Sequence, residues 1–392
     1  MHDVIISGAG PSGSKCAELI AKAGYDVALI EKDITWRKPC GGGVSSRIFK
    51  YYPQLHELEP PKITGISMFS GDYHKLSYSW ETKRDYSIVM DRLELDNFIR
   101  NVAIDAGANL FDKTISLDFV YEDKKKVGIK TKSSDGTKKF LGKIIIIADG
   151  MSSKLANKSG LREKWKVEEL GLAKCAIMEG DYDLSTNHIN VYFRPYKGYG
   201  WIFPISKNRF NIGCGTFEEA NRQHNLNDIY DEFISDPHIK KYVDIDKCKT
   251  IWSGSYSLPA LGVKESSLYG ENVMIIGDAA GFVSPISGEG IHPSIVSGKV
   301  AAETAITALT KNEISKKTLK SYAKHPNIKK IIRNFNLKRS LVEFFYKNEG
   351  ENLNNMLQLA TENTVYRDEI VNMFLFNQIP SRDLIRKIRE KK

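Results

Sequence analysis

The sequence predicts a mixed α/β (α+β) fold with a Rossmann-like domain, an antiparallel-sheet domain and a C-terminal helical region. Three observations in the 392 residues predict this organisation. A strand, a glycine-rich turn, a helix and a second strand follow each other within residues 3–31, which is the order of a βαβ unit. Residues 171–260 alternate apolar and polar side chains between turns, as antiparallel strands do. Residues 313–392 have helical patterning that is interrupted by prolines.

The Rossmann-like domain is expected to be assembled from separate segments of the chain. The runs 144–147 and 273–276 consist of apolar residues, which is typical of strands buried on both faces. Helices are predicted at 91–106 and from 291 to about 309. We therefore assign residues 1–60, 91–165 and 265–310 to the Rossmann-like domain, 61–90 and 166–264 to the antiparallel-sheet domain, and 311–392 to the helical region.

The composition is that of an ordinary globular protein. Hydrophobic residues make up 41% of the chain and charged residues 27%, which excludes fibrous and disordered classes. No run of about 18 uncharged apolar residues occurs, and the first residues do not resemble a signal peptide. The five cysteines have neither disulfide-like nor metal-ligand spacing. We expect a cytoplasmic protein without a metal site.

The net charge of +9 is concentrated at the C-terminus, where residues 311–392 contain 18 Lys or Arg and 9 Asp or Glu. Within 381–389, Leu384, Ile385 and Ile388 share one helical face and basic residues occupy the remainder. No arginine-rich arm or aromatic-basic motif for nucleic acid accompanies this charge. A membrane surface and an acidic partner protein remain the alternatives. We expect peripheral membrane association, with docking of an electron donor such as ferredoxin as the rival.

The motif Gly8-x-Gly10-x-x-Gly13 lies between the first strand and its helix. Such a turn lets the backbone approach a pyrophosphate at a helix N-terminus, where N–H groups favour negative charge. Glu31 ends the second strand, where its carboxylate can accept hydrogen bonds from ribose hydroxyls. The motif predicts a dinucleotide site. Its predicted contacts are Gly8, Gly10, Ser12, Gly13, Ser14, Glu31 and Lys32.

Two further segments identify the dinucleotide as FAD and not NAD. Asp149-Gly150 and Gly277-Asp278 each follow a predicted buried strand, and ligands bind at that edge of open α/β sheets. Asp278 can hold a ribityl hydroxyl, and the helix near Ile291 can offer its first amides to the flavin ring. NAD domains do not need this distant third element. The predicted contacts in these segments are Arg92, Asp149, Gly150, Gly277, Asp278, Gly288, Gly290 and Ile291, although Arg92 could instead pair with Asp96.

The glycine motif, Asp149-Gly150 and Gly277-Asp278 together resemble the p-hydroxybenzoate hydroxylase-like flavoproteins. Within that group, two segments are similar to the geranylgeranyl reductase family. One is the Lys-Pro-Cys-Gly-Gly-Gly-Val sequence of residues 38–44, and the other combines Tyr-x-Trp-x-Phe-Pro at 199–204 with Gly213-x-Gly215. The resemblance covers about residues 1–310. It implies that Cys40, Gly41 and Gly43 lie near the flavin.

The second of these segments also has a direct physical interpretation as a substrate wall. If the hairpin turn falls at 207–208, Tyr199, Trp201 and Phe203 line one face of the sheet. Gly200, Gly213 and Gly215 then fall on the other face and leave a groove for a flexible hydrocarbon. A register shift of one residue would exchange the faces. The predicted substrate contacts are Tyr199, Trp201, Phe203, Pro204, Gly213 and Gly215.

Two residues are candidate acids. Cys40 lies in the triple-glycine loop and could donate a proton or gate the site, and His292 begins the predicted flavin-ring helix. The hydroxylases commonly place Ser-Arg after Asp-Gly, whereas here Ser153 is followed closely by Leu155 and Ala156. This difference argues against their way of receiving NADPH. The electron donor therefore remains open between ferredoxin, NAD(P)H and another reductant.

The resemblance implies an FAD-dependent reductase that saturates C=C bonds of geranylgeranyl chains, with archaeal membrane glycerophospholipids as the preferred substrate class. One alternative is a flavin-dependent monooxygenase or halogenase of the same fold. The other is a prenyl-tail reductase that acts on a quinone or a chlorophyll-type substrate. An isoprenoid lipid and an external electron donor are thus the expected partners, and nucleic acid is not.

Overall fold

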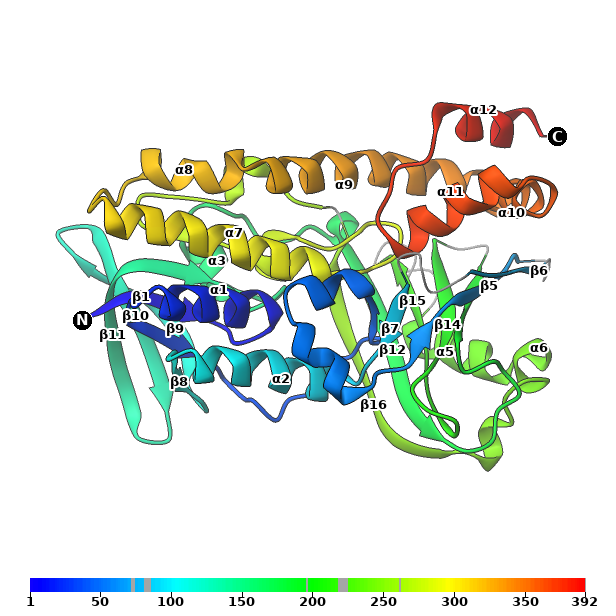
Figure 1. The fold of residues 1–392 in the computed structure, drawn as a ribbon, viewed down its shortest axis with the longest axis horizontal. Coiled ribbons are helices and arrows are strands. Elements are labelled where there is room, and N and C mark those ends of the chain that lie inside the picture. Colours follow the sequence, from blue (N-terminus) through cyan, green and yellow to red (C-terminus); the bar gives the residue numbers. More distant parts are fainter. Residues whose placement is uncertain (72–74, 81–85, 195–196, 218–224, 261, 392) are drawn as a thin grey trace.

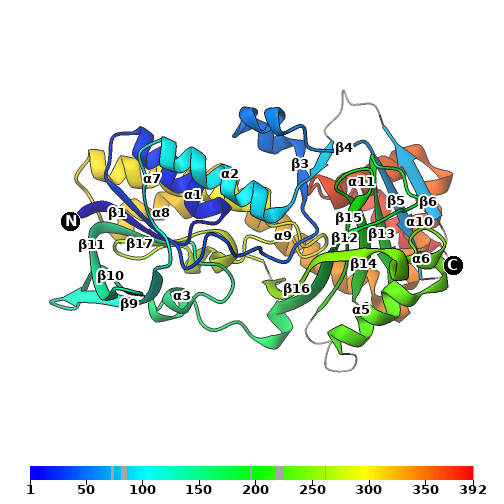
Figure 2. The ribbon, with the colours of Figure 1, turned by 90° about the horizontal axis from the view of Figure 1, so that it is seen from below.

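The computed structural model describes residues 1–392 except 72–74, 81–85, 195–196, 218–224, 261 and 392 (Figure 1). The protein is elongated, with the N-terminal sheet at one end and a second large sheet at the other (Figures 1 and 2). The mixed α/β fold class, with a Rossmann-like part, an antiparallel sheet and C-terminal helices, is confirmed.

The first sheet has a parallel core in the order β8-β2-β1-β11-β17. The strand β11 is long, because its first half pairs with a hairpin while its second half lies between β1 and β17. That second half is the isoleucine run 144–147, which is completely buried, as the sequence predicts. The strands are β1 His2–Ser7, β2 Val27–Ile30, β8 Asn109–Phe111, β9 Ile115–Glu122, β10 Lys125–Ser133, β11 Gly136–Ile147 and β17 Val273–Ile275.

Three helices pack against one another beside this sheet. The helix α1 (Pro11–Lys22) packs against both α2 (Arg92–Asp105) and α7 (Ile291–Thr310). The helix α1 begins earlier than the predicted helix because Pro11 occupies its first turn, where the missing N–H costs nothing. Gly24 follows its end with a φ of 85°, a value that favours glycine. The short helix α3 (Lys154–Lys158) lies against β9.

The second large sheet has the order β16-β12-β15-β14-β13-β5-β6. All of its neighbours are antiparallel except β5 and β13, which run parallel. The helix α5 (Leu226–Ser235) covers one face through Phe233, and α6 (Pro237–Lys240) follows it. The strands are β5 Gly65–Phe69, β6 Lys75–Ser79, β12 Leu170–Glu179, β13 His188–Phe193, β14 Gly198–Pro204, β15 Arg209–Phe217 and β16 Lys249–Pro259.

A small sheet with the strand order β3-β7-β4 lies in space between the two large sheets (Figure 2). Its strand β3 continues directly from the triple-glycine loop, so the loop is anchored at its C-terminal end. The strands are β3 Gly43–Ser45, β4 Lys62–Ile63 and β7 Ser87–Val89. The 3₁₀ segment η1 (Ser46–Lys50) follows β3.

The C-terminal helices connect both ends of the protein. The helix α8 packs against α7, and α9 then runs toward the second sheet (Figure 1). There α10 and α11 bury Met356, Leu357 and Ile370 in one apolar cluster with Ile66 and Val191 of the sheet. The helices are α8 Lys316–Lys324, α9 Pro326–Phe345, α10 Glu351–Glu362, α11 Thr364–Leu375 and α12 Arg382–Glu390.

The apolar face predicted within 381–389 is part of this core. Leu384 and Ile388 are 1% and 0% exposed, and Ile385 packs against the same cluster. The three residues therefore share one helical face, as the periodicity predicts, and α12 packs on α10 with this face turned inward. Among the described residues, no helix is long and apolar enough to cross a membrane.

We predict that Ile388→Ala destabilises the fold by about 2–5 kcal/mol, because it removes a fully buried side chain and leaves a cavity. Urea unfolding followed by circular dichroism measures this change. The control is Arg382→Ala on the exposed side of the same helix, for which we expect a change within about 0.5 kcal/mol. Equal stability of the two variants would contradict the packing of α12.

Candidate functional site

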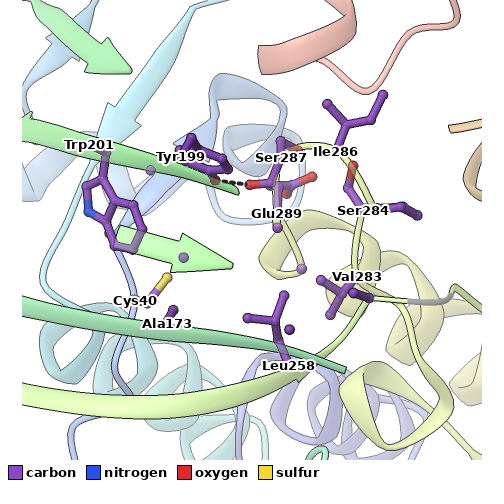
Figure 3. Close-up of a pocket in the computed structure, with 18 of the residues that line it drawn as sticks. Cys40, Ala173, Tyr199, Trp201, Leu258, Val283, Ser284, Ile286, Ser287 and Glu289 are labelled. Atoms are coloured by element: carbon purple, nitrogen blue, oxygen red, sulfur yellow. Dashed lines mark hydrogen bonds between the residues drawn. The ribbon is translucent and has the colours of Figure 1, made fainter. Parts of the chain in front are cut away.

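A large cavity lies between the loop before α7 and the face of the second sheet that carries the aromatic motif. Its empty space, counted together with the open mouth, is about 1830 Å³. Figure 3 shows Cys40 and Trp201 on one side of it and Val283, Ser284 and Ile286 on the other. Pro11, at the start of α1, also lines the cavity. The cavity therefore adjoins the predicted dinucleotide turn.

The three motif glycines have different structural roles. A Cβ on Gly8 would lie 2.4 Å from the carbonyl oxygen of Ala148, and one on Gly13 would lie 1.9 Å from the carbonyl oxygen of Gly8. Both residues are therefore required where β1, β11 and α1 meet. A Cβ on Gly10 would meet no atom within 4 Å. Gly10 thus faces the open space in which a pyrophosphate is expected.

The predicted ribose ligand Glu31 binds the backbone on both sides of the site. Its Oε2 accepts a hydrogen bond from Ala9 N at 2.7 Å, and its Oε1 accepts one from Lys32 N at 2.8 Å. The Lys32 ammonium lies 4.7 Å from the centre of the Trp36 ring. Within α1, Ser14 Oγ donates to the carbonyl of Ala9 at 2.9 Å. These contacts hold the glycine turn and the end of β2 together.

The site residues fit a bound flavin dinucleotide because several buried polar atoms have no partner. Among the described residues, none binds Ser284 Oγ or Ser287 Oγ, which are buried in residues that line the cavity. Asp149 Oδ1 is also buried without a partner, but Asp149 is not among the described residues that line the cavity. Burial raises the pKa of Asp149 to about 6, and a hydrogen bond with Ser153 partly opposes this shift. Buried polar groups normally have partners. A ligand with hydroxyl and amide groups would supply them.

Asp278 of the Gly277-Asp278 segment lines the cavity, and its carboxylate is already paired. Lys38 of the triple-glycine loop forms an ion pair with its Oδ2, and Ser294 Oγ lies 3.5 Å from its Oδ1. The Lys38 ammonium also lies 5.5 Å from the centre of the Tyr256 ring. Asp278 can hold a ribityl hydroxyl only where Lys38 shares or releases it.

Arg92 forms the ion pair with Asp96 that the sequence analysis gave as the alternative to a cofactor contact. It is buried and forms a two-pronged ion pair with Asp96, at 3.0 and 2.8 Å. It also lines the cavity and interacts with the thiol of Cys40. Its guanidinium is therefore held by Asp96 at the cavity wall, beside Cys40.

The loop before α7 contributes most of one cavity wall. Gly288, Gly290 and Ile291, which are predicted to contact the flavin, line the cavity. The N-cap residue Gly290 has no capping side chain. Instead Glu289 Oε1 accepts a hydrogen bond from His292 N at 2.9 Å. Glu289 therefore takes over the capping of this helix.

The predicted faces of the aromatic hairpin are wrong for two of the glycines. Tyr199 lies opposite Gly215 and Trp201 opposite Gly213, and residues directly opposite in an antiparallel pair share one face. The turn is centred on residue 207, one half-step from the predicted position, because Ile205 N and Ser206 N both bond to the carbonyl of Arg209. Gly200 alone falls on the other face, as predicted, where a Cβ would collide with Phe233.

The glycines make room for the indole ring. A Cβ on Gly213 would lie 2.4 Å from Trp201 Cζ2, so the indole lies across β15. Tyr199, Trp201 and Phe203 line the cavity in the same row. Tyr199 OH donates to the carbonyl of Ser287 at 2.6 Å (Figure 3), and burial raises its pKa, so this hydroxyl keeps its proton. Pro204 ends β14 and does not line the cavity in the described part of the chain.

The triple-glycine loop is held against this aromatic row. The carbonyl of Cys40 accepts a hydrogen bond from Asn211 Nδ2 at 3.0 Å, and Asn211 Oδ1 accepts one from Trp201 Nε1 at 2.8 Å. A Cβ on Gly41 would lie 2.8 Å from the Phe203 ring. Cys40 and Gly43 both line the cavity. The thiol of Cys40 is thus placed where a bound substrate could reach it.

The other candidate acid, His292, lies elsewhere. Its ring stands 5.9 Å from the ring of Tyr51, and it is absent from the described residues that line the cavity. A direct proton transfer from His292 has no geometric support.

Sequence reasoning missed Glu289, Tyr256 and Phe374, which also line the cavity. Glu289 lies between two predicted contacts, so an acid in the flavin-ring loop was a usable signal. Tyr256 and Trp252 are four residues apart on the edge strand β16. This spacing of two aromatic residues in a strand was also a usable signal in the sequence. Phe374 lies in the C-terminal helices, and nothing local in the sequence connects it to the cavity.

We predict that Gly10→Ala folds normally but binds FAD at least about tenfold more weakly, a loss of about 1.4 kcal/mol. Its Cβ meets no protein atom but enters the expected pyrophosphate space. Flavin content after purification and FAD titration of the apoprotein measure the effect. Gly13→Ala is the contrast, since its Cβ would strike backbone and impair folding itself. Full FAD affinity in Gly10→Ala would place the pyrophosphate elsewhere.

The comparisons with known proteins identify the family of this chain. Residues 1–334 match the family described as FAD binding domain. A menaquinone reductase of Mycobacterium tuberculosis is 32% identical over 325 residues, which cover 77% of this chain and 76% of that protein. A digeranylgeranylglycerophospholipid reductase of Thermoplasma volcanium is 26% identical over 380 residues, which cover 92% of each chain.

A solved structure matches the fold along the whole chain. The geranylgeranyl bacteriochlorophyll reductase-like protein from Thermoplasma acidophilum has a TM-score of 0.84 at 23% identity, with 100% of this chain and 96% of that chain covered. The predicted family resemblance and the predicted cofactor FAD are confirmed. The chain belongs to the FAD binding domain family and is an FAD-dependent oxidoreductase.

Proposed function

We propose that this protein reduces C=C bonds in geranylgeranyl chains, and that archaeal-type membrane glycerophospholipids are its substrates. The observation that carries the proposal is an apolar extension of the cavity beyond the aromatic row. Strand β13 and the C-terminal helices form its walls with almost no charge. The lining side chains there are Ile189, Val191, Phe193, Val342, Phe345, Leu353 and Phe374.

This extension suits a long hydrocarbon for physical reasons. Phe374 packs edge-on against both Phe193 and Tyr199, so aromatic surface continues from the motif toward the helices. Tyr346 OH donates to the carbonyl of Gly198 and thereby satisfies its own polar atom. A flexible apolar chain gains free energy from burial in such a space. A small aromatic substrate would leave most of it empty.

FAD, when bound and reduced, supplies the hydride for such a reaction. An isolated alkene is not activated, so this chain must contribute position and exclusion of water. Trp201 and Phe203 present a rigid wall, and Cys40 offers an S–H proton at the same cavity. We assign Cys40 the role of proton donor to the second alkene carbon.

The substrate must also reach the protein from a membrane. We propose that the exposed lysines of α8 and α9 bring the protein to an anionic surface, where each contributes about 1 kcal/mol. Lys316, Lys317, Lys320, Lys329 and Lys330 are exposed there. An external reductant, such as a ferredoxin or NAD(P)H, is the second proposed partner. The buried apolar face of α12 has no part in this contact.

A quinone prenyl tail is the second candidate substrate. The M. tuberculosis relative at 32% identity is named menaquinone reductase, and the apolar lining of the cavity also suits the prenyl tail of a quinone. Which headgroup is recognised decides between the candidates. A monooxygenase or halogenase would instead require molecular oxygen.

We predict that dithionite-reduced protein, without oxygen, adds hydrogen to a geranylgeranyl lipid in steps of two atoms per double bond. Mass spectrometry of the lipid measures this directly. Substrate is offered in anionic vesicles at low and high salt, and higher salt is expected to slow turnover. Faster saturation of the prenyl tail of menaquinone than of the phospholipid chains would favour the quinone candidate. A product that needs oxygen and gains an oxygen or halogen atom would contradict the proposal.

We predict that Cys40→Ser retains FAD but slows reduction about 100-fold or more, in line with the loss of a positioned acid. The matched control is Cys248→Ser, whose thiol lies outside the cavity and bonds to the carbonyl of Asp244. Flavin absorbance and single-turnover oxidation of the reduced protein by lipid separate binding from chemistry. Unchanged single-turnover rates in Cys40→Ser would remove this thiol from the mechanism.

A further inference from the structure

A completely buried lysine lies in the middle of α9. Lys338 is 0% exposed, and its Nζ donates to the carbonyl of Met373 at 3.0 Å and to Asn377 Oδ1 at 2.6 Å. A buried ammonium costs several kcal/mol unless it is paired. No carboxylate of the described residues forms a direct ion pair with it. Its charge must therefore be compensated through an intermediate group.

That intermediate group is the amide of Asn377. Its Oδ1 accepts from Lys338, and its Nδ2 donates to Glu289 Oε2. Glu289 Oε1 accepts from His292 N at 2.9 Å. Lysine, amide, carboxylate and the first turn of α7 thus form one continuous chain of hydrogen bonds. We call Lys338, Asn377 and Glu289 the relay.

The relay ends at the cavity. Glu289 lines it between Gly288 and Gly290 (Figure 3), in the loop where the flavin ring is expected. The other charged group near this carboxylate is Arg47 of η1, whose guanidinium donates to the carbonyl of Phe376 at 3.3 Å. The Tyr199 hydroxyl bonds to the neighbouring Ser287 and stays neutral.

The two ends of the relay titrate close to neutrality. Burial raises the pKa of Glu289 to about 6, against the opposing effects of the His292 amide and Lys338. Burial lowers the pKa of Lys338 to about 7, although Glu289 opposes this shift. Apolar side chains of similar volume often replace buried ion pairs without loss of stability. Stability alone therefore does not explain why these charges are buried beside the cavity.

We propose that the relay sets the reduction potential of the bound flavin, with the Glu289 carboxylate as the acting charge and Lys338 as its counterion. Charge near the flavin ring changes its electronic properties. Reduction of the flavin by two electrons with uptake of one proton leaves its ring with one more negative charge than the oxidised ring. A nearby carboxylate therefore disfavours this reduction, and a protonated lysine linked to that carboxylate weakens the effect. This inference requires bound FAD but not the proposed prenyl substrate.

The test compares midpoint potentials of the bound flavin from pH 5 to pH 9, recorded by its absorbance and without lipid. Glu289→Gln removes the charge with nearly the same shape. We expect its midpoint potential to match that of the wild type near pH 5, because the Glu289 carboxyl is then protonated and, like the glutamine amide, neutral. Above pH 7 we expect a more positive potential in Glu289→Gln, because the wild type then carries the carboxylate.

Lys338→Met tests the counterion. Without the lysine, Glu289 keeps its proton to higher pH. We therefore expect the midpoint potential of Lys338→Met to depart from that of Glu289→Gln at a higher pH than the potential of the wild type does. Arg339→Met on the same helix removes an exposed charge and should follow the wild type. If Lys338→Met does not fold, Asn377→Leu breaks the relay instead and should shift the profile in the same direction.

The proposal fails if Glu289→Gln follows the wild-type potential over the whole pH range. It also fails if both relay variants leave the pH of the transition unchanged. Because the readout is the flavin spectrum alone, a protein that reduces no prenyl lipid can still confirm the relay, and an active reductase can still refute it.

Discussion

The hydrogen-bond chain from Trp201 through Asn211 to the carbonyl of Cys40 connects the two halves of the site. Asn211 is only 3% exposed, and its amide uses both its acceptor and its donor in these contacts. An amide in this position recognises one backbone carbonyl and one indole N–H at the same time. The triple-glycine loop, which follows β2 of the first sheet in the chain, is thereby fixed to the antiparallel strands of the second sheet. The cavity exists because these two parts meet in this one arrangement.

Volume is the second constraint on this contact. Gly41 and Gly213 leave space for the Phe203 and Trp201 rings, and any Cβ there would enter the rings. Gly42 has a φ of 77° and would collide with the carbonyl of Met90. The glycines of both signature segments thus allow aromatic rings and loop backbone to pack closely. The predicted register, which was wrong by one residue, suggested that these glycines leave an empty groove. In the structure they do not, and the cavity lies beside the row of aromatic rings.

Local patterns predicted well what local interactions decide. The glycine turn, the apolar run 144–147 and the start of α7 each carry a recognisable local pattern, and each element was found where that pattern places it. The register of β14 and β15 depends on which carbonyl accepts the hydrogen bonds of the turn amides. A shift of that acceptor by one residue changes the register. The burial of Leu384 and the link from Lys338 to Glu289 depend on contacts between segments far apart in the chain. Helical periodicity shows an apolar face, but it does not show what covers that face.

The C-terminal helices therefore belong to the functional site although they lack its recognisable motifs. The family match ends at residue 334, whereas Val342, Phe345 and Phe374 close the apolar end of the cavity. The same helices place Lys338 and Asn377 against the flavin-ring loop. A rearrangement of these helices would alter the space for a hydrocarbon and the charge beside the cofactor together. The helices α9 and α11 therefore contribute both to the apolar wall of the cavity and to the burial of Lys338, because Phe345 and Phe374 line the cavity and Lys338 donates to the carbonyl of Met373.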